Sequence, residues 1–442
     1  MIQRDLTRGN VAYSLIVFSL PMILGNILQQ CYNIADTLIV SYVLGPNALA
    51  AVGSSFTLMT FITSIILGLS IGSGTLFSIR FGQRDEDGLK DSVAAAFFLI
   101  AILTIIITSL SYLTINLLES FLSVPKTIWP LMKSYLIFIY LGIPAIFLYN
   151  FFSSFLRALG ESKTPLIFLA ISTILNILLD IIFVLLLKLG VIGAATATII
   201  SQYLAGLGIM LYSFKYSKLL KGAIRIKRVK KSVLKNLFSF SLLTCLQQSV
   251  MNLGILLVQG LINSFGAVIM ASYAIAVKID AFAYMPSQEF GNAFSTFIAQ
   301  NSGAKKSDRI KKGIKVAFSI STIYCLLMAL ILNLLSSNLM SIFVSDSTII
   351  NEGVRYLRIE GSFYIGIGYL FLLYGLFRAL SKPGISLLLT IISLGTRVVL
   401  AYILSSFIGV VGIWVSIVIG WFLADLTGIL IYLLNPYLRM NK

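Results

Sequence analysis

The chain has 442 residues, of which 58% are hydrophobic and only 11% are charged, and its mean hydropathy is +0.97. Soluble domains carry about 25% charged residues, so this composition excludes a large water-soluble domain and predicts a polytopic membrane protein. The formal net charge is +17, which in a soluble protein suggests nucleic-acid binding. Here the basic residues fall between the apolar runs, so we expect no nucleic-acid partner.

The residue types that most often carry catalysis or hold transition metals are scarce. Histidine is absent from the sequence, which removes the commonest general base and metal ligand. The three cysteines, Cys31, Cys245 and Cys325, lie far apart in apolar runs and indicate neither a disulfide framework nor a metal site. We therefore expect no enzyme and no cofactor. Residues 1–10 are polar and the first apolar run exceeds a signal peptide in length, so no cleavable signal is predicted.

Apolar runs of about 20 residues, the length that crosses a bilayer as a helix, recur along the whole chain. The expected fold is all-α, with twelve transmembrane helices at residues 13–40, 48–79, 92–117, 131–156, 164–187, 191–214, 236–262, 268–300, 314–336, 355–378, 385–407 and 410–434. With the N-terminus inside, the cytoplasmic segments carry about 26 Lys and Arg and the outside loops about 5. The positive-inside rule then places both termini in the cytoplasm, and we expect the plasma membrane.

The sequence repeats itself after about 220 residues. Four segments of the first half, at residues 28–30, 82–97, 157–159 and 190–193, align with residues 246–248, 303–318, 378–380 and 409–412. Two six-helix bundles with the same orientation predict a pseudo-twofold axis along the membrane normal and a central cavity. We therefore expect an N-lobe over residues 1–214, a basic cytoplasmic linker over residues 215–235 and a C-lobe over residues 236–442.

Ionisable side chains within the predicted spans are few, and each is a candidate functional group because it is costly to place at membrane depth. We single out Asp36, Asp180, Lys278, Asp280, Glu289, Arg397 and Asp425. The two halves differ in this respect. An offset of 221 aligns Asn176 with Arg397 and Asp180 with Ala401, so the repeat preserved the scaffold but not the charged groups.

Polar groups of the first, fifth and sixth spans form the first candidate site. Asp36 lies in the first span, and Asp180 lies one helical turn after Asn176 in the fifth. Together with a hydroxyl of the sixth span, from Thr196 or Thr198, they offer the oxygen ligands that hard cations such as Na⁺ prefer, while a buried carboxyl group can instead hold a proton. The alternative is that Asp36 and Asp180 are neutral packing residues. Other residues that could line this cavity are Asn33, Tyr135, Thr196 and Gln202.

The eighth span carries a second set of charges. Lys278 and Asp280 are two residues apart, so their side chains point to different faces of the helix. Each could pair with Glu289 or Arg397. Two interpretations remain open: ion pairs that fix helix packing, or contact of Lys278, Asp280 or Glu289 with a substrate. Asp425 is open to the same two interpretations.

These motifs resemble the multidrug and toxic compound extrusion (MATE) family, more closely its DinF-like branch, over nearly the whole chain. The resemblance rests on ADT at 35–37, LGPNALAAVG at 44–53, Pro21 fifteen residues before Asp36, the pair Asn176 and Asp180, Thr198 eighteen residues later, and Tyr135. It implies that Asp36, Asn176, Asp180 and Thr198 form an N-lobe site for H⁺ or Na⁺. Tyr135 would line this site, and Pro21 would be a hinge in the first helix.

The sequence departs from the NorM-like branch of the family, which adds acidic residues in the seventh and tenth spans. Here the seventh span has Gln247 and Gln248, and residues 361–377 of the tenth contain no acid. A C-lobe cation site of that type is therefore not expected.

The expected function is export of amphipathic, often cationic organic compounds by a cation-coupled antiporter that works by alternating access. The alternative is a flippase for lipid-linked substrates. A flippase should have a more cationic cavity, whereas acids outnumber bases within these spans. An intramembrane enzyme is disfavoured because there is no HExxH motif and no nucleophile with a partner base. The expected partners are membrane lipid and small organic substrates, and we expect a monomer.

Overall fold

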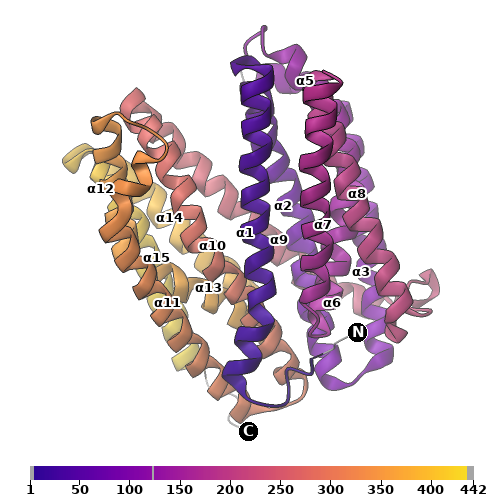
Figure 1. The fold of residues 1–442 in the computed structure, drawn as a ribbon. Helices are drawn as coiled ribbons and strands as arrows, with labels where there is room; N and C mark the ends of the chain where they lie inside the picture. The colour runs from indigo at the N-terminus through magenta and orange to yellow at the C-terminus, as the bar shows by residue number, and fades with distance from the viewer. Residues whose placement is uncertain (1–3, 122–123, 436–442) are drawn as a thin grey trace. The chain divides into compact units, whose positions relative to one another are not determined.

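The computed structural model describes residues 4–121 and 124–435, and these residues form helices and connecting loops without a strand (Figure 1). The longer helices of the first half are α1 (Val11–Leu44), α2 (Pro46–Gln83), α3 (Glu86–Thr114), α5 (Trp129–Ile139), α6 (Ile143–Ala158), α7 (Lys163–Asp180) and α8 (Gly190–Tyr216). Those of the second half are α9 (Lys231–Ser264), α10 (Ala267–Gly303), α11 (Ser307–Ser341), α12 (Ser347–Ser362), α13 (Tyr364–Ala379), α14 (Pro383–Ile408) and α15 (Val410–Leu434). The all-α fold class is confirmed.

Among the described residues, eleven helical segments are long and apolar enough to cross a membrane. The pair α12 and α13 supplies a twelfth if it is counted as one broken span, and on that count the prediction of twelve is confirmed. The predicted tenth helix, residues 355–378, was wrong in one respect. It begins earlier, at Ser347, and is interrupted at Phe363, where α12 and α13 meet at 53°.

A local cause of this break lies in the last turn of α12. The hydroxyl of Ser362 donates to the backbone carbonyl of Arg358 at 2.7 Å, a type of side-chain bond that competes with the helix ladder and bends helices. Gly361 precedes it, and Gly–Ser pairs are common sites of sharp kinks. A uniformly apolar pattern does not reveal such a break.

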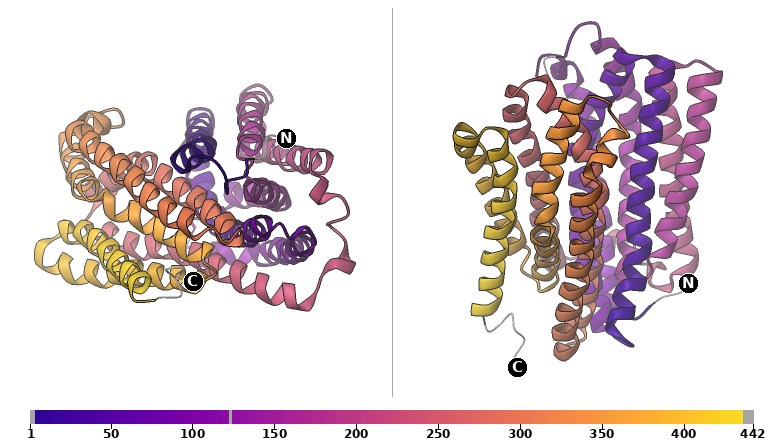
Figure 2. Two further views of the ribbon diagram at one scale, coloured as in Figure 1. Left: turned by 90° about the horizontal axis from the view of Figure 1, so that it is seen from below. Right: turned by 60° about the vertical axis from the view of Figure 1, so that its left-hand side comes forward.

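The chain packs as two compact units. Unit 1 includes Leu20–Cys245, and unit 2 includes Leu6–Ser19 together with the residues from Leu246 onward. In unit 1, α6 contacts α2, α3 and α8, and in unit 2, α13 contacts α10, α11, α14 and α15. Three of the helices that contact α13, namely α11, α14 and α15, can be followed in orange and yellow in Figure 2. The centre of each unit is therefore the same repeat element, the second half of its fourth span.

The segment Leu6–Ser19 packs within unit 2. The backbone N–H of Leu6 donates to Gln300 Oε1 at 3.1 Å, and Asn301 Nδ2 donates to the Leu6 carbonyl at 3.2 Å. The Arg309 guanidinium donates to the carbonyls of Leu6, Arg8 and Gly9. The helix α1 passes from unit 2 to unit 1 after Ser19, and Pro21 lies inside this continuous helix just beyond the division.

The internal repeat is also present in the backbone. Four pairs of residues with positive φ lie at offsets of 219–221: Gly45 and Gly266, Arg84 and Lys305, Gly160 and Ser381, and Gly190 and Gly409. Positive φ is uncommon outside glycine, and three of these residues are not glycine. The two halves therefore turn in the same way between corresponding helices, as the sequence repeat predicts.

The basic segment at residues 215–235 packs on unit 1. It contains two short helical turns, η4 (Lys218–Leu220) and η5 (Ile226–Arg228), which contact α3. Lys230 Nζ lies 2.6 Å from the buried carboxylate of Asp91 at the start of α3. The ion pair fixes this segment at the end of unit 1 where α2 and α3 are connected.

Candidate functional site

Three helices of unit 1 bring the predicted polar residues together. Asp36 comes from α1, Asn176 and Asp180 come from α7, and Thr198 comes from α8. Asp180 has 0% of its surface exposed, and Asn176 and Thr198 are also buried. Leu166 and Leu169 of α7 lie closest to Gly25, so this small residue allows α1 to approach α7 about three helical turns before Asp36.

Hydrogen bonds connect these helices. Asn176, with its amide oriented so that donors meet acceptors, donates from Nδ2 to Asp180 Oδ2 at 2.8 Å and accepts from the backbone N–H of Thr198 at 3.2 Å. The Thr198 hydroxyl donates to the Ala194 carbonyl at 3.0 Å and so accepts from the Tyr32 hydroxyl at 3.2 Å. The side chains of α1, α7 and α8 thus form one polar network.

The two carboxyl groups of this network are neighbours. Asp36 and Asp180 lie within hydrogen-bonding reach of each other. One oxygen of each, Oδ1, is buried and has no hydrogen-bond partner among the described residues. Buried polar atoms in folded proteins are normally satisfied, and two adjacent carboxylates repel each other unless a positive charge or a proton intervenes. The arrangement is therefore suited to binding a proton or a small cation.

The backbone changes where Asp180 sits. The α-helical hydrogen bonding of α7 ends at Asp180, and a π-helical turn, η3 (Ile181–Leu186), continues the span. The backbone N–H of Leu187 bonds to the Ile182 carbonyl at 2.8 Å in this turn. Single π-turns inside helices occur frequently at functional sites. The sequence analysis did not predict this change.

Other residues predicted for this site have different positions. Tyr135 is buried near both Asp36 and Asp180, and Tyr32, which the sequence analysis missed, joins them. Tyr32 lies four residues before Asp36 and therefore shares its helix face, and this spacing could have identified it. The Gln202 amide oxygen instead lies against Gly142, in the turn between α5 and α6. The other two candidates make local contacts within their own helices: the Asn33 carbonyl accepts from Thr37, and the Thr196 hydroxyl donates to the Ile192 carbonyl.

Unit 2 contains a second buried group of charges. Lys278 is exposed and Asp280 is buried, so the two residues occupy different faces of α10, as their spacing predicts. The Tyr364 hydroxyl, at the start of α13, donates to Asp280 Oδ1. The charges of Glu360 and Arg397 both act on Asp280, which places α10, α12 and α14 around one cluster.

Glu360 is the residue of this cluster that the sequence analysis missed. It lies in α12, directly before the apolar stretch 361–377, and only 2% of its surface is exposed. Its carboxyl group interacts with Tyr356 and Arg397. Tyr356 packs edge-on against Trp414, with ring centroids 4.8 Å apart. Aromatic rings therefore enclose a cluster of two acids and one base.

Glu289 and Asp425, the remaining acids of the predicted set, lie in unit 2. Glu289 Oε1 accepts from Asn292 Nδ2 at 3.3 Å and is close to Arg378. Asp425 on α15 is buried with 5% exposure, and its Oδ1 has no hydrogen-bond partner within the part of the chain that the structure describes. Asp425 lies near Tyr374 and Gly366 of α13.

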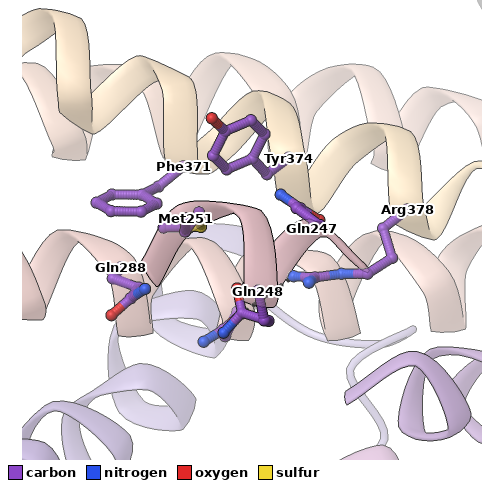
Figure 3. Close-up of a pocket in the computed structure, with 8 residues that line it drawn as sticks. Gln247, Gln248, Met251, Gln288, Phe371, Tyr374 and Arg378 are labelled. Carbon is purple, nitrogen blue, oxygen red and sulfur yellow. Dashed lines mark hydrogen bonds between the residues drawn. The ribbon is translucent and has the colours of Figure 1, made fainter. Parts of the chain in front are cut away.

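Three helices of unit 2 line a small, open pocket (Figure 3). Each helix contributes residues spaced three, four or seven apart, which share one helix face. The lining residues are Gln247, Gln248 and Met251 of α9, Gln288 and Asn292 of α10, and Phe371, Tyr374 and Arg378 of α13. Amide groups, one guanidinium and aromatic rings thus face a common space.

Comparison with known proteins identifies the family. The MatE family model matches residues 21–182 and 241–403. A relative from Bacillus subtilis, "Probable multidrug resistance protein YpnP", is 30% identical over 97% of this chain and 96% of its own. "Multidrug export protein MepA" from Staphylococcus aureus is 26% identical over 96% of this chain and 94% of its own.

A solved structure agrees with the fold along the whole chain. It is that of a MOP superfamily transporter from Pyrococcus furiosus, described as having a binding pocket of reverse polarity that suggests a different function. The two structures superpose with a TM-score of 0.92 at 25% identity, covering 100% of this chain and 99% of the other. The matched family model covers most of both repeats, and the chain therefore belongs to the MatE family of multi-pass membrane transporters.

Proposed function

We propose that this protein is a cation-coupled antiporter of the plasma membrane that exports amphipathic, often cationic organic compounds by alternating access. The observation that carries the proposal is the neighbouring pair of the half-buried Asp36 and the buried Asp180, in which each carboxyl group has one buried oxygen without a partner among the described residues. The names of the relatives YpnP and MepA, which refer to multidrug resistance and export, support organic compounds as substrates.

The coupling ion would be held by Asp36, Asn176, Asp180 and Thr198. For Na⁺, the carboxylate, amide and hydroxyl oxygens offer the hard ligands that this ion prefers, and the unpartnered Oδ1 atoms fit that need. For a proton, one carboxyl group suffices, and its neighbour accepts the hydrogen bond. Tyr135 and Tyr32 close the network on the side of α5 and α1, and Pro21 would let α1 bend when the ion is exchanged.

The free energy released by movement of one ion is large enough to drive export of the substrate against a gradient. One charge that moves through 100 mV releases about 2.3 kcal/mol, and a tenfold concentration ratio corresponds to about 1.4 kcal/mol. One ion per cycle therefore supports roughly a fifty-fold gradient of substrate. Coupling requires that the ion and the substrate cannot bind at the same time. This would follow if ion binding changed the shape of the N-lobe cavity.

Purified protein in liposomes tests the proposal. A proton gradient and a Na⁺ gradient are imposed separately, and the movement of ethidium is followed by fluorescence. We expect uphill movement of the dye with one of the two gradients and none without a gradient. Equal movement without any gradient, or transfer of a lipid-linked substrate between leaflets without dye transport, would support the flippase instead.

The proposed orientation gives a separate prediction. The segment at residues 215–235 carries nine Lys and Arg and no acid, so it should face the cytoplasm. In a background without native cysteines, a single cysteine in place of the exposed Lys218 should stay unlabelled when a membrane-impermeant maleimide is added to intact cells. It should react after the cells are opened. Labelling of intact cells within minutes would reverse the orientation and the direction of transport.

A further inference from the structure

Arg378 is an unusual residue in the pocket of unit 2, because it is a base that is almost fully buried, with 4% exposure. Its Nη2 donates to Asn292 Oδ1 at 3.0 Å, and its Nε donates to Ser295 Oγ at 3.5 Å. A guanidinium has five N–H donors, so these contacts fix its position and leave donors for a ligand. Figure 3 shows the guanidinium extending between Gln247 and Gln248.

The counter-charge of Arg378 lies outside the pocket wall. Asn292 stands between Glu289 and Arg378, since it donates to Glu289 Oε1 at 3.3 Å and accepts from Arg378. Among the described residues that line the pocket, Arg378 is the one with a formal charge at neutral pH. A group that enters the pocket therefore meets a guanidinium that Asn292 and Ser295 hold in place. This positive charge favours a ligand with an anionic oxygen.

The other walls define what accompanies the anionic group. Gln248 and Gln288 present amides that can donate to a carboxylate or accept from an adjoining amine. The Phe371 ring is stacked on Tyr284 with ring centroids 6.4 Å apart and planes inclined by 25°, and with Met251 it forms an apolar wall. This apolar wall beside the guanidinium suits a carboxylate that is attached to an aromatic ring.

The repeat gives a natural comparison in unit 1. An offset of 221 aligns Arg378 with Arg157, but it aligns Gln288 and Asn292 with Leu67 and Ile71. The two amides that α10 supplies are thus missing from the corresponding helix of unit 1, whereas the arginine and the two glutamines of the LQQ repeat are kept. The combination of the arginine with the α10 amides is specific to unit 2, and Arg157 provides a matched control.

We infer that the pocket around Arg378 binds the carboxylate of amphipathic aromatic acids or zwitterions, with the guanidinium and the amides of Gln248 and Gln288 as donors. Arginine suits this role because its planar fork matches a carboxylate with two parallel hydrogen bonds. The inference rests on the proposed export of amphipathic compounds and defines a class among them.

Equilibrium binding to the purified full-length protein in detergent tests the inference. The probes are dansylglycine, a fluorescent aromatic carboxylate, and dansylglycinamide, its neutral counterpart. The wild type should bind the acid about tenfold more tightly than the amide, because charge-assisted hydrogen bonds are roughly twice as strong as neutral ones. Arg378→Gln should reduce this ratio to about one, whereas Arg157→Gln should preserve it.

A second variant decides the outcome if Arg378→Gln does not fold. Gln248→Glu keeps the number of heavy atoms beside Arg378 but places a carboxylate where the ligand would bind, so it should reverse the preference in favour of dansylglycinamide. A purely structural Arg378 predicts no such reversal. An unchanged preference for the acid in Gln248→Glu, or a wild type that binds both probes equally or binds neither, would overturn the inference.

The result is independent of ion coupling. If the acid is preferred but no gradient drives dye export, the proposed antiport is wrong and the pocket stands. If dye export follows a gradient but the acid is not preferred, the pocket assignment is wrong and the antiport stands.

Discussion

Replacing Asp180 with asparagine should abolish gradient-driven export and remove the pH dependence of what transport remains. Asparagine is nearly isosteric and keeps a hydrogen bond to Asn176, but it cannot exchange a proton or offer a charged ligand to Na⁺. The substrate gradient should therefore fall from roughly fifty-fold per coupled charge to about one. Dye export in liposomes, measured from pH 5.5 to pH 8.5, is the test, and Asp36→Asn should behave in the same way.

The matched control for this experiment is Asp425→Asn. Asp425 is also a buried acid, but it lies on α15 of unit 2, outside the network of Asp36 and Asp180. It should retain coupled export. If Asp180 were only a packing residue, Asp180→Asn would export at close to the rate of the wild type and still respond to the gradient. That result would remove Asp180 from the coupling site.

Replacing Arg397 with leucine should destabilise unit 2 more than most single substitutions. Arg397 acts on two buried acids, Asp280 and Glu360, and its loss leaves both without a nearby base among the described residues. Removal of one partner from a directly paired buried cluster costs about 3–5 kcal/mol. Arg397 is half-buried and acts on the two acids without a direct ion pair among the described residues, so we expect a smaller loss, about 1–3 kcal/mol. The thermal midpoint of the purified protein in detergent should fall accordingly.

A double variant separates the electrostatic effect from lost packing. Adding Glu360→Gln to Arg397→Leu removes one of the two acids, so it should restore a substantial part of the lost stability, and the coupling between the two sites can be read from the double-mutant cycle. Lys278→Leu is the control, because the exposed Lys278 should change stability by about 0.5 kcal/mol or less. Strict additivity of the two changes would show that Arg397 does not compensate Glu360.

The sequence by itself determined the membrane class, the number of spans and their approximate ends. A bilayer requires about 20 apolar residues per helix, and this local requirement leaves a pattern that composition reveals. It also determined the repeat, and the matched turns at Arg84 and Lys305 or at Gly160 and Ser381 have the same backbone conformation. The pairing of Asn176 with Asp180 was accessible for the same reason, because residues four apart share a helix face.

Only the tertiary structure decided which side chains of different helices meet. Helical periodicity orients a side chain on its own helix but does not say which helix it faces. Tyr32 therefore joins Thr198, while Gln202, one turn from Thr198, turns to Gly142 instead. Glu360 precedes the break at Phe363 and lies close to Asp280. Hydropathy did not reveal this break, because it depends on local competition for backbone hydrogen bonds. Arg378, at a helix end in the sequence, became a pocket residue because α9, α10 and α13 pack around it.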